Sequence, residues 1–213
     1  MGLEIGINGV NKAITKVEFG VNSAWKEVNK SEIGINNAWK EGYVNIPGPS
    51  ILIAGDTNAG YYGKAIGIIT INDLISKTGV VEGTAQVSGD ITWLKFAYQG
   101  KTLFVADRVL KCSLSWDDIN AHDCVFGKII SLQKSYKCRL ICGTEWNNLI
   151  VKFTPNNEDS HSSDHIFSWV QDTYYQISDE RYCYGGGDAT SMEHIYKGEI
   201  DTDVGWRPVL ELL

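Results

Sequence analysis

The stretch ITWLKFAYQGKTLFVA, residues 91–106, has the pattern of a β-hairpin. Apolar and polar positions alternate on either side of Gln99-Gly100, and this period of two is typical of strands with one buried face. Trp93 and Phe96 fall on opposite faces of an ideal strand, because successive side chains alternate. We therefore expect a hairpin that is buried in part on both faces.

Two short segments predict helices with clear end signals. Leu74 and Ile75 are apolar and precede Gly79, which suits a helix that ends in a glycine cap. In SWDDINAH, Ser115 can cap a helix, and Asp118 follows three places later, as in a capping box. We expect short helices at both places.

A third helix is predicted by GTEWNNLIVKF, residues 143–153. Thr144 can act as its N-cap, and Glu145 then lies in the first turn. One face repeats at the i, i+3, i+4, i+7 spacing and should point to a core. That face consists of Trp146, Leu149, Ile150 and Phe153.

The chain closes on GWRPVLELL, residues 205–213, which predicts an apolar strand inside a sheet. Arg207 within it must find hydrogen-bond acceptors if it is buried, because a guanidinium keeps its charge. Before this strand, TPNNEDSHSSDH, residues 154–165, is polar and predicts an exposed loop.

The N-terminal part repeats one phrase at a period of fourteen residues. Asn-Gly, Asn-Ser and Asn-Asn stand where each unit must reverse direction, so each unit predicts a small β-hairpin. A single hairpin is marginal in water and needs a surface to pack on. The three copies are EIGINGVNKAITKV (4–17), EFGVNSAWKEVNKS (18–31) and EIGINNAWKEGYVN (32–45).

These repeats leave two interpretations open. They could stack against the domain that follows, or they could form a module that attaches to another subunit of a large assembly. Repetition favours attachment, because docking can use the same small surface several times, whereas catalysis needs one particular arrangement of residues. The candidate attachment residues are Trp25, Lys26, Trp39 and Lys40.

A boundary follows the repeats at NIPGPS, which holds two of the four prolines of the chain. We expect three domains or segments: the hairpin repeats at 1–44, a linker at 45–50, and the main domain at 51–213.

Composition limits the function classes. The chain has 213 residues, 43% hydrophobic content and a formal net charge of −7, so we expect a folded protein that binds neither nucleic acid nor an anionic membrane surface. The N-terminus lacks the pattern of a secretory signal, so synthesis in the cytoplasm is expected. Five cysteines make an odd number, which argues against a complete disulfide framework.

Metal and catalytic sites are expected to be absent. Cys138 and Cys142 beside His122 and Cys124 allow a zinc site to be imagined, but their spacing equally suits core positions of a strand. The loop cluster DSHSSDH would also permit a metal-binding or catalytic site, although polar loops are usually solvated. No sequence motif for a nucleophile or a phosphate loop is present, so we expect no enzyme activity and no cofactor.

The aromatic and acidic segment from Trp169 to His194 is the best candidate for a ligand surface. Aromatic rings offer rigid apolar area with a polar edge, which suits sugars and protein partners alike. The alternative is that most of these rings belong to the core. The residues expected to be exposed and ligand-binding are Tyr174, Tyr175, Tyr184, Asp188 and Glu193.

Several segments together resemble structural proteins of tailed bacteriophages that infect Gram-positive hosts, whose N-termini often carry GVNG-W-K-type repeats. The segments are AGYYGKAIGIITINDL, TWLKF, GKTLFVA, SWDDINAHDCVFG, YKCRLICGTEWNNLI and GWRPVLEL, and the resemblance covers nearly the whole chain. The second half is also similar to the C-type-lectin-like fold of formylglycine-generating-enzyme relatives, on which Arg181, Gly185, Gly186 and Gly205-Trp206-Arg207 can be placed.

The resemblance implies an α+β, β-rich fold: N-terminal β-hairpin repeats followed by a C-type-lectin-like domain, whose closing strand pairs near its opening strand. It also implies a virion protein of tail-fibre or receptor-binding type that attaches through its repeats to other virion proteins and recognises a bacterial cell-surface glycan or protein. A head fibre, decoration or baseplate component is the alternative, and a hydrolase of wall polysaccharide is a third. A homo-oligomer is expected in each case.

Overall fold

The structure is a computed structural model that describes residues 46–154 and 166–213, together with the backbone of the strands within residues 4–44. The DSHSSDH cluster of the expected polar loop lies outside the described residues. The chain divides into two compact units, Met1–Pro47 and Gly48–Leu213.

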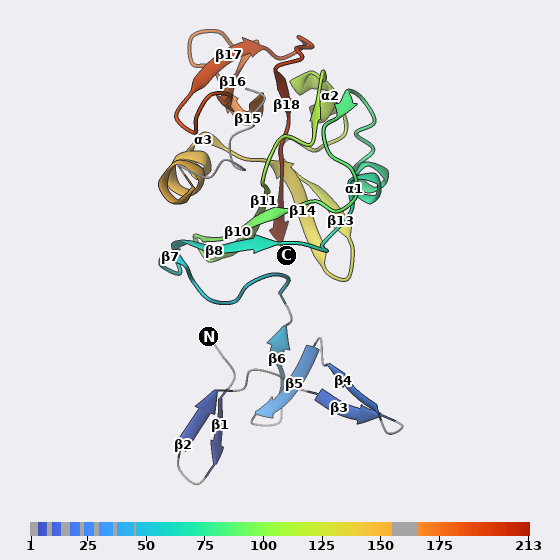
Figure 1. Cartoon of the computed structure of the whole chain (residues 1–213), viewed down its shortest axis with the longest axis vertical. Coiled ribbons are helices and arrows are strands. Elements are labelled where there is room, and N and C mark those ends of the chain that lie inside the picture. Colours follow the sequence, from blue (N-terminus) through green and yellow to red (C-terminus); the bar gives the residue numbers. More distant parts are fainter. Residues whose placement is uncertain are drawn as a thin grey trace. The chain divides into compact units, whose positions relative to one another are not determined.

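The first unit contains three β-hairpins among its described strands, each a separate antiparallel sheet (Figure 1). In each one the glycine of the repeat pairs with the residue five positions later, so the fourteen-residue period sets a common register. The hairpin repeats expected from the sequence are therefore present. The pairs are Gly6–Asn11, Gly20–Trp25 and Gly34–Trp39, and the strands are β1 Glu4–Ile7, β2 Val10–Ala13, β3 Glu18–Val21, β4 Ala24–Glu27, β5 Lys30–Ile35 and β6 Ala38–Val44.

The second unit begins inside the segment predicted as a linker. The amine of Lys95, on the sheet of this unit, donates a hydrogen bond of 2.7 Å to the carbonyl oxygen of Pro49. Gly48 lies so close to Ala65 that a Cβ at position 48 would be 2.5 Å from that side chain. The end of the predicted linker therefore packs on the domain.

One antiparallel sheet of the second unit has seven described strands in the order β13-β14-β19-β11-β10-β8-β7. The expectation that the closing strand pairs near the opening strand is wrong, because the hairpin β10–β11 lies between β19 and β8. The strands are β7 Ala54–Gly55, β8 Ala59–Ala65, β10 Trp93–Tyr98, β11 Lys101–Ala106, β13 Lys128–Ser131, β14 Ser135–Leu140 and β19 Pro208–Leu212.

The hairpin predicted from residues 91–106 is confirmed as β10–β11. Its two-residue turn consists of Gln99 at φ 48° and Gly100 at φ 78°, the pair of positive angles of a type I′ turn. Trp93 and Phe96 are both fully buried although they point to opposite faces, as expected for a strand covered on both sides.

The second sheet has six described strands in the order β17-β16-β15-β18-β12-β9, and β17 forms one of its edges (Figure 1). Its pairs are antiparallel except for β15 and β18, which run parallel. The strands are β9 Thr84–Ala85, β12 Lys111–Cys112, β15 Phe167–Thr173, β16 Glu180–Gly185, β17 Met192–Tyr196 and β18 Val204–Trp206.

Both helices with clear end signals are confirmed. Helix α1, Ile71–Thr78, ends at Gly79, whose φ of 83° is the left-handed conformation of a glycine cap. Helix α2, Trp116–Ala121, begins with the predicted capping box: Ser115 Oγ accepts from the Asp118 amide at 3.0 Å, and the Asp118 carboxylate accepts from the Ser115 amide at 2.8 Å.

The third helix is confirmed, but its predicted cap is wrong. It begins with α3, Gly143–Glu145, after Cys142, and Glu145 accepts from the Cys142 amide at 3.3 Å. The helix starts two residues earlier than an N-cap at Thr144 would give, and Asp172 accepts from the Gly143 amide at 2.7 Å at this start. It continues as a π-helix, η1, Trp146–Val151, a rare wide turn.

Arg207 stands between β18 of one sheet and β19 of the other, and it is 2% exposed. As expected, its guanidinium finds acceptors: it donates to the carbonyl oxygens of Ala106 at 2.7 Å and of Asp107 at 3.0 Å. It also lies over the ring of Trp146, 5.2 Å from the centroid. Burial lowers the pKa of Arg207 to about 10.

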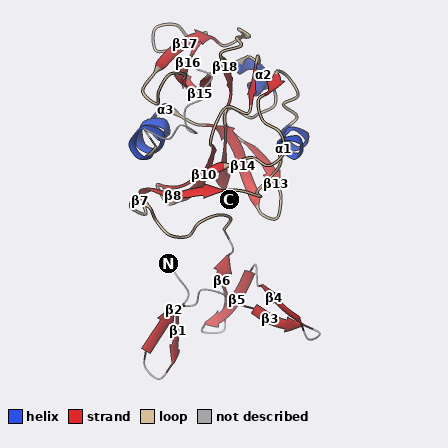
Figure 2. Ribbon diagram, in the orientation of Figure 1, coloured by secondary structure: helices blue, strands red, loops and turns tan. Residues whose placement is uncertain are grey.

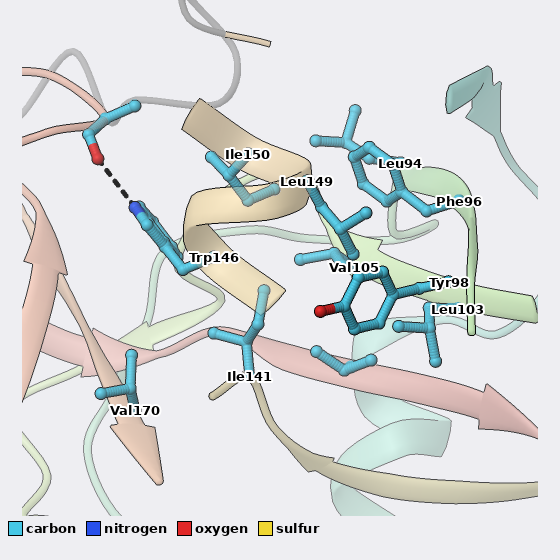
Figure 3. Packing of buried hydrophobic residues seen from close by; sticks show 12 residues of the cluster. Leu94, Phe96, Tyr98, Leu103, Val105, Ile141, Trp146, Leu149, Ile150 and Val170 are labelled. Atoms are coloured by element: carbon cyan, nitrogen blue, oxygen red, sulfur yellow. Dashed lines mark hydrogen bonds between the residues drawn. The ribbon is translucent and has the colours of Figure 1, made fainter. Parts of the chain in front are cut away.

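The core forms where one face of the hairpin β10–β11 meets the π-helix (Figure 3). Trp146 anchors this contact, and its indole nitrogen donates to the Ala189 carbonyl oxygen at 2.7 Å. Strands predominate over a few short helices, so the β-rich α+β class expected from the sequence is confirmed (Figure 2). The buried cluster comprises Leu94, Phe96, Tyr98, Leu103, Val105, Ile141, Trp146, Leu149, Ile150, Val170, Ala189 and Val209.

Candidate functional site

The five predicted ligand residues lie on β16, β17 and the turns beside them. Tyr174 and Tyr175 open the turn between β15 and β16, and Tyr184 lies on β16. Tyr175 is 78% exposed, whereas Tyr174 and Tyr184 are half-buried. Asp188 and Glu193 are exposed.

The pairing of β16 with β17 decides which of these side chains share a face. Tyr182 pairs with His194, and Tyr184 pairs with Met192. Alternation along the strand then places Tyr182, Tyr184 and His194 on one face of the sheet. We define the aromatic surface as Tyr174, Tyr175, Tyr182, Tyr184 and His194.

Contacts between rings connect the aromatic surface to the core. Tyr184 stacks on the buried Trp146 with ring centroids 5.7 Å apart, and Tyr182 is the next ring, 6.1 Å from Tyr184. Tyr174 meets Tyr182 edge to face at 5.4 Å, and Tyr175 lies 5.1 Å from Tyr174. The series therefore runs from a fully buried tryptophan to an exposed tyrosine, which gives the outer rings a rigid base.

His194 lies between a tyrosine ring and a carboxylate. Its imidazole stacks on Tyr174 at a centroid distance of 3.9 Å and an interplanar angle of 4°. Its Nδ1 lies 2.5 Å from the carboxylate of Glu180, which is almost fully buried. These two contacts hold the imidazole in one orientation on the surface.

A second carboxylate, that of Asp172, acts on Tyr184. Burial raises the pKa of the Tyr184 hydroxyl, and the negative charge of Asp172 raises it further. Tyr184 also lies against the start of the third helix, because a Cβ at Gly143 would be 3.0 Å from the Tyr184 hydroxyl. The helix that Asp172 caps therefore positions Tyr184 as well.

The structure does not bring Asp188 and Glu193 to the aromatic surface. The Asp188 carboxylate accepts from the amide nitrogens of Thr190 at 2.7 Å and of Ser191 at 2.8 Å, so it holds its own turn. Glu193 pairs with Cys183, and alternation places it on the opposite face of the sheet from Tyr184.

Sequence reasoning did not single out Tyr182, His194, Asp172 or Glu180. The spacing of Tyr182 and Tyr184 by two positions was a usable signal, because it places both rings on one face of a strand. The contribution of His194 depends on the register between β16 and β17, and Asp172 acts through a contact with Gly143, twenty-nine residues away. Neither the β16–β17 register nor the contact of Asp172 with Gly143 can be predicted from residues that are close together in the sequence.

Exposed apolar side chains extend the aromatic surface along β17. Met192 is 54% exposed and Tyr196 is 55% exposed, and both alternate onto the same face as His194. A cluster of large exposed apolar side chains is typical of an interaction surface.

The cysteines serve the packing of the domain. A hydrogen bond with Cys138 lowers the pKa of Cys124, and the same bond raises that of Cys138. The Nε2 atom of His122, the histidine that the sequence analysis considered together with these cysteines, lies 3.1 Å from the carboxylate of Glu82. Cys142 is the one cysteine that is half-buried, and burial raises its pKa. Within residues 46–154 and 166–213, no three His, Cys, Asp or Glu side chains gather closely enough to hold a metal ion.

The predicted attachment residues lie on equivalent strands of two hairpins. Trp25 and Lys26 belong to β4, and Trp39 and Lys40 belong to β6. Each tryptophan pairs with the glycine of its own repeat.

Comparisons with protein-family models, with curated proteins and with solved structures find no match for this chain. In the part of the chain that the structure describes, no helix is long and apolar enough to cross a membrane.

Proposed function

We propose that this chain is a non-enzymatic virion protein of a tailed bacteriophage, of the tail-fibre or receptor-binding type. Its hairpin repeats anchor it to other virion proteins, and its second unit is a C-type-lectin-like domain that binds a glycan on the surface of the host cell. It is made in the host cytoplasm and ends in the virion. It needs no metal, cofactor or chemical step for this role.

The observation that carries the proposal is the aromatic surface. Tyr175 exposes most of its ring, and the half-buried rings behind it rest on Trp146. Rigid tyrosines contribute a large contact area at a small cost in conformational entropy, and their hydroxyls can bond to sugar hydroxyls.

The repeats support the other half of the proposal. Three hairpins with one register offer the same small surface several times, which suits docking to a repeated neighbour. A particle with many copies of this chain, assembled as homo-oligomers, binds a cell by avidity even if each site is weak.

Binding of the purified full chain to host cells tests the proposal, with the double variant Tyr174→Ala/Tyr175→Ala as the probe. We expect the variant to bind about tenfold more weakly, since exposed aromatic anchors carry much of the affinity of a surface. Phe126→Ala is the matched control, because Phe126 is an aromatic residue that is 58% exposed elsewhere in the domain. Equal binding by the double variant and the control would exclude the aromatic surface as the receptor site.

A structural role, as a head fibre, decoration or baseplate component, is the second candidate. Strand β17 favours it, because β17 is an edge of the sheet among the described strands and exposes Met192 and Tyr196, so another protein could add a strand there. A full chain that binds purified particles but not host cells would establish this role.

A further inference from the structure

The net charge of the chain is concentrated in the sequence segment that carries the aromatic surface. Residues 172–203 contain eight acidic and two basic residues, a net charge of −6 out of −7 for the chain. By contrast, residues 1–47 contain five lysines and five glutamates and are neutral. The acidic residues are Asp172, Asp179, Glu180, Asp188, Glu193, Glu199, Asp201 and Asp203, and the basic ones are Arg181 and Lys197.

Each of the two basic side chains of this segment has a partner within the domain. Arg181 alternates onto the opposite face of β16, where its guanidinium lies over the Trp116 ring at 4.4 Å. Lys197 forms an ion pair of 3.1 Å with Asp179. The carboxylate of Glu180 contacts His194 of the aromatic surface, and the charge of Asp172 acts on Tyr184.

The rings of the aromatic surface differ in orientation. Tyr174 and Tyr175 are inclined by 54°, and Tyr174 and Tyr182 by 85°. A flat neutral sugar ring stacks best on one shared plane, which these inclined rings do not offer, whereas a cation needs the exposed face of only one ring. That arrangement favours a cation, which is attracted to the face of an aromatic ring.

One ring of the chain already lies between two partners of these kinds. The His194 imidazole lies between the face of Tyr174 and the Glu180 carboxylate. An ammonium group on the exposed ring of Tyr175 would meet a tyrosine face within a segment of net negative charge.

We infer that the aromatic surface recognises an ammonium group carried by a saccharide, such as the amine of a deacetylated amino sugar. This inference rests on the proposed function, and it adds that the saccharide ligand carries a positive charge. Neutral sugars gain only contact area at this surface, and anionic sugars are repelled by the carboxylates around it.

Calorimetric titration of the full chain at about pH 6 tests the inference with two probes of the same backbone. The glucosamine tetramer carries ammonium groups, and the N-acetylglucosamine tetramer carries none. We expect the glucosamine tetramer to bind at least about tenfold more tightly, a difference that one desolvated cation on an aromatic face can supply. Equal affinities, tighter binding of the acetylated tetramer, or no binding of either would overturn the inference.

Two variants separate a specific site from general attraction to an acidic protein. Tyr175→Ala keeps the net charge, and we expect it to weaken binding of the glucosamine tetramer about fivefold. Glu199→Gln removes one exposed charge outside the aromatic surface, and we expect it to have little effect. If Glu199→Gln weakens binding as much as Tyr175→Ala does, the attraction is non-specific and the inference fails.

The cell-binding experiment distinguishes this failure from failure of the proposed function. If Tyr174→Ala/Tyr175→Ala reduces cell binding while the glucosamine tetramer does not bind, recognition of the host remains and the ligand is not cationic. If cell binding is also unaffected, the proposed function itself is wrong.

Discussion

Arg207 is the residue at which the two sheets of the second unit meet. Its guanidinium reaches the carbonyl oxygens at the end of β11 and the ring of Trp146 at the same time. A planar group with several donors can make these contacts together, whereas a lysine amine on a flexible stem cannot.

We predict that Arg207→Lys lowers the free energy of unfolding by about 3 kcal/mol, because it leaves a buried charge without its full set of partners. Urea denaturation monitored by tryptophan fluorescence measures the change. Arg108→Lys provides the control: the Arg108 side chain is 47% exposed and pairs with Asp107, so a change within about 0.5 kcal/mol is expected. Similar losses in the two variants would contradict this account of Arg207.

Lys95 should make stability depend on pH. Its side chain is 5% exposed, and burial lowers its pKa from 10.5 to about 8. Between these two values the unfolded chain binds more protons than the folded chain, so folding is favoured as the pH rises. Below about pH 8 the folded protein carries the full cost of a buried ammonium group.

We therefore predict that the protein gains roughly 2 kcal/mol relative to Lys95→Met between about pH 7.5 and about pH 9.5. Denaturation of both proteins at each pH gives the difference, and this comparison removes the contributions of all other titrating groups. A difference that stays constant with pH would show that the Lys95 amine is hydrated in the folded protein.

At the scale of single elements, the turn of the β10–β11 hairpin offers a test of backbone strain alone. A Cβ at Gly100 would have no neighbour within 4 Å, so its only cost is the positive φ. We predict that Gly100→Ala lowers the free energy of unfolding by about 1 kcal/mol. In Gly198→Ala, the new Cβ would be 3.6 Å from Asp117 and φ is not positive, so thermal unfolding should be nearly unchanged.

The elements with local end signals could be predicted from the sequence, and the elements shaped by distant contacts could not. Ser115 and Asp118 lie three residues apart and form the expected capping box. The start of the third helix was predicted wrongly: Asp172 accepts from the Gly143 amide there, and Glu145 is held by a buried ion pair with Arg139 at 2.7 Å. Asp172 and Arg139 reach these positions only through the order of the strands in the two sheets.

For the whole molecule, the two units should carry separate tasks. We predict that Trp25→Ala/Trp39→Ala reduces capture of the protein by purified particles about tenfold, because one anchor is lost from each of two hairpins. Binding to host cells by the free protein should be unchanged. Lys16→Ala controls for general effects of substitution in this unit. A double variant that loses both activities would show that the repeats do not act as a separate module.

The overall organisation follows from repeats and alternation, which are visible in one sequence. The fourteen-residue period predicted the three hairpins, and the alternation around Gln99-Gly100 predicted a central part of the large sheet. The order of the strands was not accessible, since β19 joins β11 and β14 across about a hundred and about seventy residues of chain. For the same reason the sequence indicated Tyr174, Tyr175 and Tyr184 of the aromatic surface but not Tyr182, the histidine or the carboxylates beside them.

The half-buried thiol of Cys142 provides a native attachment point for a fluorescent reporter. It precedes the helix that supports Tyr184 through Trp146, while the other four cysteines of the chain are buried. Because burial raises its pKa, conjugation with a maleimide dye calls for a mildly alkaline buffer, where more of the thiol is ionised. A dye at this position would report occupancy of the neighbouring rings without any engineered cysteine.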